Sequence, residues 1–324
     1  MNNTLETGFD KFTVKIQKAM ENHYGDEYIV NIKEVNKNNG LLIHGLTVMK
    51  KSEMVCPTIY LESFYERYNE GESLSDIVME IIEILRVSDE YKPEGLDSFN
   101  EYEQVKSRLI IKLINKRFNE KLLENIPYRD FCDLAIVCMV EVDMPGGQTG
   151  SVLIHNNHIC MWGVHEKQLI DDAISNSFAK GNAVIRRMED MISSIYHSMN
   201  DGVEEISEEQ IEDMKNCPGG LYVLTNEKQL YGAASIVYKE VRNRLSEQMG
   251  GDFYIIPSSV HELIIVPNDI GSSLMNLNEM INEVNSTMVS KDEILSNHAY
   301  LYDSGKDLLI PASEVVAFQI NSLD

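Results

Sequence analysis

The chain is poor in cysteine, and its few cysteines follow no disulfide or metal-ligand spacing. Five occur among 324 residues, an odd number at wide intervals, and no CxxC pair is present. A disulfide framework and a structural zinc knuckle are therefore not expected. Most of these cysteines stand in apolar runs, which predicts reduced residues in the core of a cytosolic protein. The five cysteines are Cys56, Cys132, Cys138, Cys160 and Cys217.

Long apolar runs are also missing. The longest, at residues 134–140, is far shorter than the ~20 residues that a membrane-spanning helix needs. The N-terminal stretch MNNTLETGFDKF lacks the basic start and the apolar segment of a secretion signal. We therefore expect a cytoplasmic protein that binds no membrane.

Basic charge is scarce relative to acidic charge. Lys and Arg number 28 against 52 Asp and Glu, which gives a net charge of -24. Such a surface repels phosphate backbones and anionic lipid headgroups over a Debye length of about 8 Å. Direct binding to a nucleic-acid backbone is thus excluded, whereas a protein partner is compatible with this charge. The acidic residues are scattered among Lys and Arg, which favours a soluble acidic protein over a nucleic-acid mimic.

Apolar spacing predicts helices and hairpins along the whole chain. The apolar content of 43% is typical of a globular protein, and the length allows about two domains of roughly 150 residues each. Ser73 with Asp76 resembles a capping box before an apolar-periodic stretch. We predict helices at 5–24, 74–85, 166–178, 234–249 and 274–288, a strand at 134–142, and hairpins at 28–48, 151–162, 253–266 and 300–310. Hairpins mixed with helices, without regular strand–helix–strand alternation, predict an α+β fold with mixed or antiparallel sheets in two lobes.

An acidic segment interrupts this pattern near residue 200. Residues 199–215 contain few large apolar side chains, and turn-forming Asn-Asp-Gly and Pro-Gly-Gly sequences stand at either end. This composition is typical of a linker. We predict an N-terminal α+β lobe at 1–199, an acidic linker at 200–218 and a C-terminal α+β lobe at 219–324.

The most compact polar cluster lies between two predicted strands, 253–256 and 263–266. It contains Ser258, Ser259, His261 and Glu262. An HExxH zinc motif is excluded, because Ile265 stands where the second histidine belongs and the segment is predicted as a strand. Along a strand, i and i+2 side chains are about 6 to 7 Å apart, too far for a nucleophile–base hydrogen bond.

Two more polar sites follow from the predicted strand ends. Thr225 and Asn226 form a polar turn after a buried strand, and we group them with the preceding cluster as candidate ligand-facing residues. His155 and His158 flank a predicted two-residue turn, where their rings would face each other. A third metal ligand is not visible, so we predict a polar hairpin tip, no bound metal and no cofactor.

Several separated motifs resemble a known family. They are VNKNNGLLIHGLTV, PYRDFCDLAIVCMVEV, GGLYVLTNEKQLYGA and DFYIIPSSVHELIIVPND. Together they resemble an uncharacterised domain-of-unknown-function family that occurs mainly in Gram-positive gut bacteria of the clostridial group. The resemblance implies a bacterial cytoplasmic protein. Because the family has no assigned activity, it implies no catalytic residues.

Two functional hypotheses remain from the sequence. The first is a binding or regulatory protein without catalytic activity, because no complete catalytic motif is present. The alternative is a hydrolase or metal-assisted enzyme that uses Ser259, His261 and Glu262 with carboxylates from elsewhere. The surroundings of His261 separate them: a concave pocket with a distant acid favours the enzyme, and apolar packing disfavours it.

Overall fold

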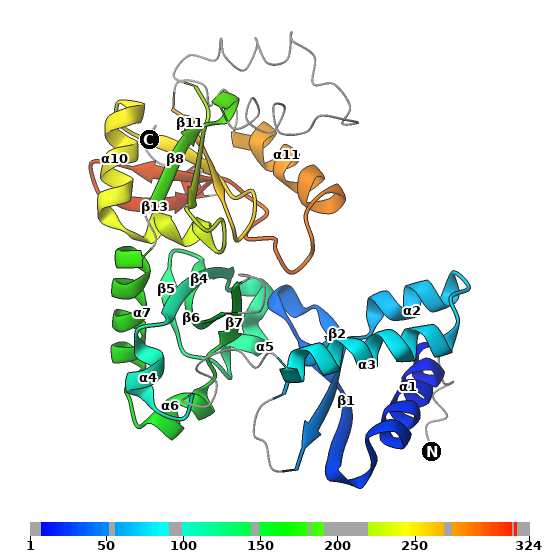
Figure 1. Ribbon diagram of the computed structural model, residues 1–324. Helices are drawn as coiled ribbons and strands as arrows, with labels where there is room; N and C mark the ends of the chain where they lie inside the picture. The colour runs from blue at the N-terminus through cyan, green and yellow to red at the C-terminus, as the bar shows by residue number, and fades with distance from the viewer. Residues whose placement is uncertain are drawn as a thin grey trace, which may run out of the picture. The chain divides into compact units, whose positions relative to one another are not determined.

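The computed structural model describes residues 8–51, 56–90, 99–143, 149–180, 183–190, 220–268, 274–312 and 314–315. The chain divides into two compact units. Unit 1 comprises Met1–Phe99 and Val142–Gly150, and unit 2 comprises Asn100–Glu141 and Ser151–Asp324. Helices and antiparallel sheets occur in both units (Figure 1), which confirms the predicted α+β class.

In the described residues of unit 1, a three-stranded antiparallel sheet packs with helices α1, α2 and α3. The strands run in the order β1-β2-β3, and the β1–β2 register pairs Tyr28 with Lys50. Asn39 and Gly40 in the connecting turn have φ values of 60° and 64°, the left-handed region that Asn and Gly accept most readily. The elements are α1 (Gly8–Tyr24), β1 (Tyr28–Asn36), β2 (Leu42–Lys50), β3 (Thr58–Tyr60), α2 (Glu62–Asn69) and α3 (Leu74–Glu90).

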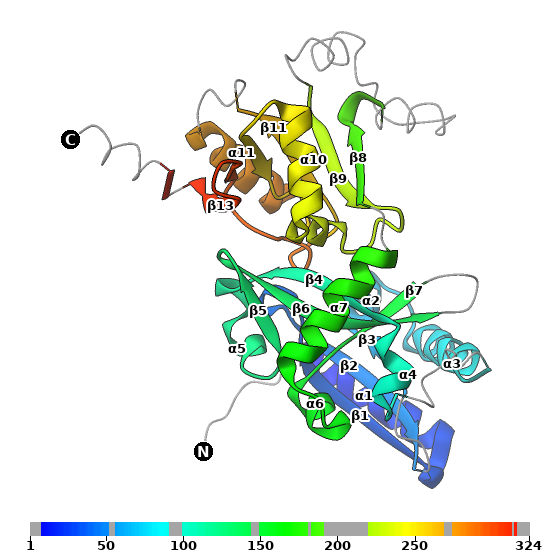
Figure 2. The same ribbon diagram turned by 90° about the vertical axis from the view of Figure 1, so that its left-hand side faces the viewer.

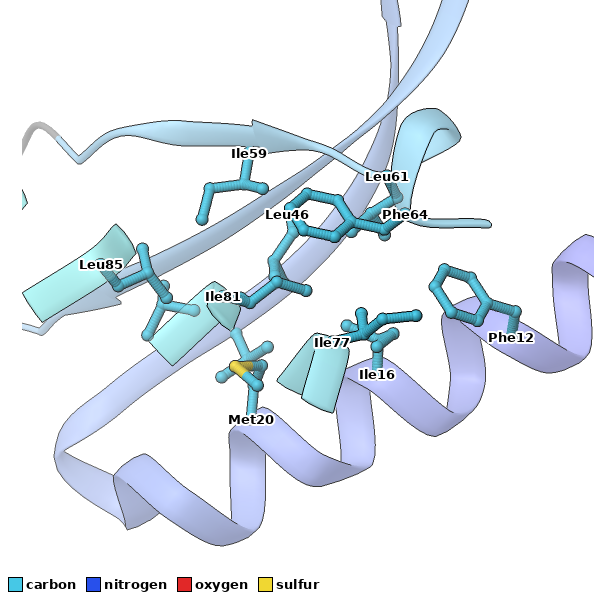
Figure 3. Packing of buried hydrophobic residues seen from close by; sticks show 12 residues of the cluster. Phe12, Ile16, Met20, Leu46, Ile59, Leu61, Phe64, Ile77, Ile81 and Leu85 are labelled. Atoms are coloured by element: carbon cyan, nitrogen blue, oxygen red, sulfur yellow. The ribbon is translucent and has the colours of Figure 1, made fainter. Parts of the chain in front are cut away.

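The core of unit 1 follows directly from helical spacing. One face of α1 presents Phe12, Ile16 and Met20, and one face of α3 presents Ile77 and Ile81. Figure 3 shows these side chains pointing toward one another and toward apolar residues of β2 and β3.

The start of α3 carries the predicted cap. The backbone N–H of Asp76 donates to Ser73 Oγ at 3.1 Å, and the Ser73 hydroxyl donates to the Asp76 carboxylate at 2.7 Å. The Ser73 hydroxyl oxygen therefore satisfies one backbone N–H that the first helical turn leaves open, and the Asp76 carboxylate holds that hydroxyl in place. The prediction of a capped helix at this point is confirmed.

The smaller sheet of unit 2 is built around β6. Its order is β4-β6-β5, and β7 also pairs with β6. Six of the seven residues of β4 are buried, which explains its continuous apolar sequence. Helix α7 packs along β4 (Figure 2). The elements are α4 (Tyr102–Lys106), β4 (Leu109–Asn115), α5 (Glu120–Leu123), β5 (Tyr128–Phe131), β6 (Leu134–Asp143), β7 (Thr149–Leu153), α6 (Asn156–Trp162) and α7 (Glu166–Lys180).

The larger sheet of unit 2 has six antiparallel strands in the order β13-β12-β10-β11-β9-β8. Helices α10 and α11 lie on opposite faces of this sheet (Figures 1 and 2). The predicted strand pairs 253–256 with 263–266 and 300–302 with 308–310 are confirmed. The elements are β8 (Ala183–Arg187), β9 (Tyr222–Asn226), a 3-10 helix (Gly232–Val237), α10 (Lys239–Met249), β10 (Phe253–Ile256), β11 (Leu263–Pro267), α11 (Leu274–Thr287), β12 (Tyr300–Asp303) and β13 (Leu308–Pro311).

The division into units differs from the predicted lobes. The segment 200–218 lies outside the described residues, but β8 before it and β9 after it are neighbours in one sheet, with Val184 opposite Thr225. Residues of the predicted N-terminal lobe and C-terminal lobe therefore share a hydrogen-bonded ladder.

The predicted hairpin at 151–162 is wrong in its second half. Residues 156–162 form helix α6, and Gly163 ends it with a φ of 64°. The backbone N–H of His155 donates to His158 Nδ1 at 3.0 Å, so the two histidines cap the first turn of a helix. Asn156 and Asn157, which suit a hairpin turn, occupy that first helical turn instead. Trp162 accordingly ends a helix, not a strand.

Two of the cysteines lie where the sequence did not predict them. Cys138 is buried, as expected, and burial raises the pKa of its thiol to about 12. Cys132 and Cys160 are exposed, and Cys217 lies outside the described residues. Cys132 occupies the tight β5–β6 turn with a φ of 58°, which takes it out of the apolar strand that follows. In the part of the chain that the structure describes, no helix is long and apolar enough to cross a membrane.

Candidate functional site

The candidate site is the loop after β9, residues 226–231, which side-chain hydrogen bonds hold at both ends. The Thr225 hydroxyl donates to the backbone oxygen of His261 at 2.9 Å. The Asn226 side chain closes the loop by donating to the oxygen of Leu230 at 2.8 Å and accepting from its N–H at 3.2 Å. The structure therefore joins Thr225 and His261, two candidates far apart in sequence, through a direct hydrogen bond.

The end of this loop is strained and tightly packed. Tyr231 has a φ of 55°, a left-handed conformation that non-glycine residues adopt only when their surroundings enforce it. A Cβ atom on the next residue, Gly232, would lie 2.4 Å from Thr225 Oγ1 and 2.6 Å from the oxygen of His261. Only glycine fits there. Backbone strain of this kind concentrates at functional sites, so the loop is a candidate for one.

The strained residue places its ring against His261. The two rings stack at a centroid distance of 5.5 Å and an interplanar angle of 17°. The Tyr231 backbone N–H donates to His261 Nδ1 at 3.2 Å, and since an N–H can only donate, Nδ1 carries no proton in this arrangement. Nε2 faces Glu293, with 3.6 Å between Nε2 and Oε1. His261 thus holds the tyrosine in place.

The other side of Tyr231 meets the smaller sheet of unit 2. Its hydroxyl lies 2.8 Å from Ser151 Oγ, and Lys112 Nζ lies 4.9 Å from the ring centroid, within cation–π range. Burial raises the pKa of the Tyr231 phenol above its ordinary value. The phenol therefore stays neutral at physiological pH and provides a hydrogen-bonding group and a flat apolar face.

A cavity of about 90 Å³ opens beside Tyr231. This space holds a small molecule or a few waters. Its lining comes from β4, the end of β6, α7, the strained loop and the 3-10 helix. The lining residues are Ile110, Ile111, Glu141, Ser177, Lys180, Asn226, Glu227, Lys228, Leu230, Tyr231, Ala234, Ser235 and Tyr238.

Two lysines and two carboxylates, Glu141 and Glu227, line the cavity, and both lysines contact Glu141. Lys228 Nζ lies 2.6 Å from Glu141 Oε1, and Lys180 Nζ lies 3.7 Å from Glu141 Oε2. The Glu141 side chain is only 12% exposed, so its charge depends on these two ammonium groups for compensation. The cavity therefore contains a place where two lysines recognise a carboxylate.

The remaining candidates of the predicted cluster bond to one another in the β10–β11 connection. Ser259 Oγ accepts a hydrogen bond from the backbone N–H of His261 at 3.0 Å. The Ser258 hydroxyl donates to Glu262 Oε1 at 3.4 Å, and the Ser259 N–H donates to the oxygen of Glu262 at 3.2 Å. These contacts build a turn, and none of the three residues Ser258, Ser259 and Glu262 lines the cavity.

The two histidines near α6 lie apart from the cavity. Their ring centroids are 5.8 Å apart, and burial lowers the pKa of both His155 and His158. The His158 ring also packs near Trp162, at a centroid distance of 5.8 Å. Within the described ranges, no group of three or more His, Cys, Asp or Glu side chains is placed to hold a metal ion.

Sequence reasoning missed a second polar cluster, at the start of β12. His298 Nε2 lies 3.1 Å from Asp133 Oδ2, and His298 Nδ1 lies 3.2 Å from Ser296 Oγ. The order Ser–His–Asp is that of a nucleophile, a base and an orienting acid. Ser296 is, however, 0% exposed, so its hydroxyl meets no substrate. The Asp133 carboxyl lies in a short turn far away in sequence, and no local signal connects it to His298.

The cavity lysines and Glu141 were missed as well, although the sequence carries a signal for two residues of the site. Lys112 is the one charged residue in the strand LIIKLIN, and Glu141 follows the apolar run of β6. A charge inside a strand that is otherwise buried requires a partner or a function. This criterion would have identified both.

Comparison of the chain with known protein families gives a family of unknown function, as the sequence motifs predict. Residues 9–304 match the family described as "Family of unknown function (DUF5688)", and the chain belongs to this family. No curated protein and no solved structure gives a significant match to the chain.

Proposed function

We propose that this chain is a binding protein that holds a small polar ligand in the cavity beside Tyr231. The observation that carries the proposal is a cavity of about 90 Å³ next to a residue held in a strained backbone conformation. His261 and Ser151 contact this residue directly, and Thr225 in turn bonds to the backbone of His261. Contacts of this kind preorganise a recognition surface at the cost of local stability.

The contacts of His261 support binding over catalysis. A general base needs a ring nitrogen free to take a proton from a nucleophile. Nδ1 of His261 accepts a backbone N–H, and Nε2 faces Glu293. The Ser259 hydroxyl meets the backbone of His261. A hydrolase that uses Ser259, His261 and Glu262 remains the alternative, and it would require this turn to rearrange.

The proposal keeps the bacterial cytoplasm as the location. The four cysteines in the described part of the chain are all free, which fits a reducing compartment. It also keeps a regulatory role, in which occupation of the cavity alters the contacts that the protein makes with a protein partner.

The test is a screen of small polar metabolites against the full chain. Thermal unfolding detects binders, and methyl NMR of Ile110, Ile111 and Ala234 locates them. We expect at least one compound to raise the melting temperature and shift these methyl resonances. Ala234→Val fills part of the cavity and should weaken binding, whereas Met288→Val, at a side chain that is 82% exposed, should not. Absence of any compound that moves the three methyl groups would refute the proposal.

A second measurement addresses the alternative. Purified protein is incubated with activated ester and amide substrates, and turnover is compared with that of Ser259→Ala and His261→Gln variants. We expect no turnover that depends on these residues. Turnover that both variants abolish, while they still unfold cooperatively, would favour the hydrolase.

A further inference from the structure

We propose that the ligand of this cavity carries a carboxylate, and that Glu141 is a built-in competitor for the two lysines that bind it. This inference rests on the proposed function, because it assigns a chemical class to the ligand of the same cavity. It makes Lys180 and Lys228 the recognition residues and makes Glu141 the residue that sets the affinity.

The geometry of Glu141 carries the inference. Its carboxylate is bound by Lys228 at 2.6 Å and Lys180 at 3.7 Å, on the wall of the cavity. The Glu141 carboxylate thus shows that the ammonium groups of Lys180 and Lys228 can bind a carboxylate on this wall. The longer Lys180 contact leaves that ammonium group the more available of the two for a second carboxylate. The side chains of Lys180 and Lys228 are 39% and 53% exposed, so their ammonium groups are able to turn toward a ligand.

The other polar groups of the wall are already engaged. The Asn226 amide bonds to both backbone groups of Leu230. Ser177 Oγ accepts from the N–H of Ile111 at 2.9 Å, and the Ser235 hydroxyl donates to the oxygen of Thr225 at 3.4 Å. A ligand therefore obtains its strongest contacts from the ammonium groups. Hydrogen bonds in which the donor is charged are roughly twice as strong as neutral ones.

The charge balance of the wall explains why Glu141 competes. Two cations, Lys180 and Lys228, face two anions, Glu141 and Glu227, so the wall is neutral within a chain of net charge -24. A bound carboxylate must share or displace Glu141 at the lysines. Removal of the Glu141 charge leaves the lysines without their internal partner and should raise the affinity for an external carboxylate.

The experiment titrates the full chain with four probes at constant ionic strength. Acetate carries the carboxylate, acetamide is its neutral isostere, methylammonium is a cation, and inorganic phosphate is a different anion. The methyl resonances of Ile110, Ile111 and Ala234 report occupation of the cavity. We expect saturable shifts with acetate, weaker ones with phosphate, and none with acetamide or methylammonium.

Variants of the two acidic residues separate competition from general electrostatics. Glu141→Gln and Glu227→Gln each remove one negative charge from the same wall. Glu141 is paired with both lysines, so it competes with acetate for them. We expect Glu141→Gln, which removes this charged competitor, to tighten acetate binding about tenfold. Glu227→Gln should change the affinity by less than about threefold, since its charge acts through partly screened solvent.

Lysine variants complete the test. The double variant Lys180→Met, Lys228→Met should lose acetate binding, while Lys306→Met, at a side chain that is 72% exposed in the β12–β13 turn, should retain it. Cooperative unfolding of each variant shows that it is folded.

The outcomes separate the two proposals. Binding of acetamide or methylammonium in the cavity without acetate would leave the binding function in place and overturn the carboxylate assignment, and so would binding of phosphate alone. An equal gain in Glu141→Gln and Glu227→Gln would overturn the role of Glu141 as competitor. Absence of binding by all four probes to both the wild-type chain and Glu141→Gln would overturn the carboxylate assignment, whereas the metabolite screen decides the binding function separately.

Discussion

The helix–sheet core of unit 1 and the Tyr231 region of unit 2 are stabilised by different means. In unit 1, one cluster of buried residues is entirely apolar and is supplied by helices and strands in regular spacing (Figure 3). Around Tyr231, buried Thr225 and Ser235 contribute through directed hydrogen bonds, and the backbone is left-handed. Apolar packing tolerates changes that conserve volume, whereas a hydrogen-bonded and strained loop depends on particular atoms.

The largest loss of stability is expected from a substitution in the apolar core of unit 1. Ile81 of α3 is 0% exposed, so Ile81→Ala should lower the free energy of unfolding by about 2 to 5 kcal/mol through lost burial and a residual cavity. Denaturant titration measures the change. Met79 lies in the same helix with 64% exposure, and Met79→Ala should stay within about 0.5 kcal/mol. Equal losses in both variants would mean that burial does not set the difference.

The second largest loss of stability is expected from a substitution in the closely packed loop that ends at Tyr231. Gly232→Ala places a Cβ atom 2.6 Å from the backbone oxygen of His261, which requires backbone movement and should cost about 1 to 3 kcal/mol. Gly305→Ala is the matched control, because its Cβ would meet only Asp303 Oδ1 at 3.5 Å, an ordinary contact. If Gly232→Ala unfolds at the same denaturant concentration as wild type, the loop is not packed as the structure has it.

A smaller effect concerns the tyrosine hydroxyl. Tyr231→Phe removes the 2.8 Å hydrogen bond to Ser151 and should cost about 1 kcal/mol, and Ser151→Ala should cost a similar amount. The double variant should be less destabilised than the sum, since both single changes remove the same interaction. Strict additivity in this double-mutant cycle would show that the two hydroxyls do not interact in solution.

The smallest effect is a pH dependence in the Asp133–His298 pair. Burial opposes ionisation of Asp133, but the hydrogen bond and charge of His298 outweigh it and lower the pKa of the carboxyl below its ordinary value. A carboxyl with a lowered folded-state pKa stabilises the protein above its unfolded pKa, near 3.9, and loses that contribution as pH falls through its folded-state pKa. The stability difference between wild type and Asp133→Asn should therefore shrink as the pH falls from about 5 to below 4.

Denaturation of both proteins between pH 3 and 7 measures this difference. Ser175→Ala, at an exposed residue of α7 outside the pair, serves as the control and should show an offset that does not change with pH. A difference that grows as the pH falls would mean that the folded-state pKa of Asp133 is raised, not lowered.

The comparison of the two regions also explains which predictions succeeded. The hairpins at 253–266 and 300–310 and the capped helix α3 were predicted because alternation, helical spacing and capping act within a few residues. The segment 156–162 was assigned wrongly because Asn156 and Asn157 suit both a hairpin turn and a first helical turn. Thr225 and His261 were each predicted as ligand-facing, but the hydrogen bond between them was not.

The cavity itself could be predicted only in fragments. Its wall combines residues of β4, β6 and α7 with the loop after β9, and the sequence places these far apart. Lys112 and Glu141 were recognisable as charges in apolar strands, whereas Lys180 and Lys228 look like ordinary surface lysines. Nothing near Tyr231 in sequence indicates its φ of 55°, and the residues that hydrogen-bond to it, Ser151 and His261, come from distant segments.

The α+β class, most of the helices and strands, and the acidic net charge follow from the sequence alone. These properties depend on composition and on periodicity along the chain. Two features follow only from the folded chain: β8 pairs with β9, and Glu141 meets Lys180 and Lys228 beside Tyr231. Pairing and ion-pair partners depend on which distant segments the packed core brings together, and that information is not local.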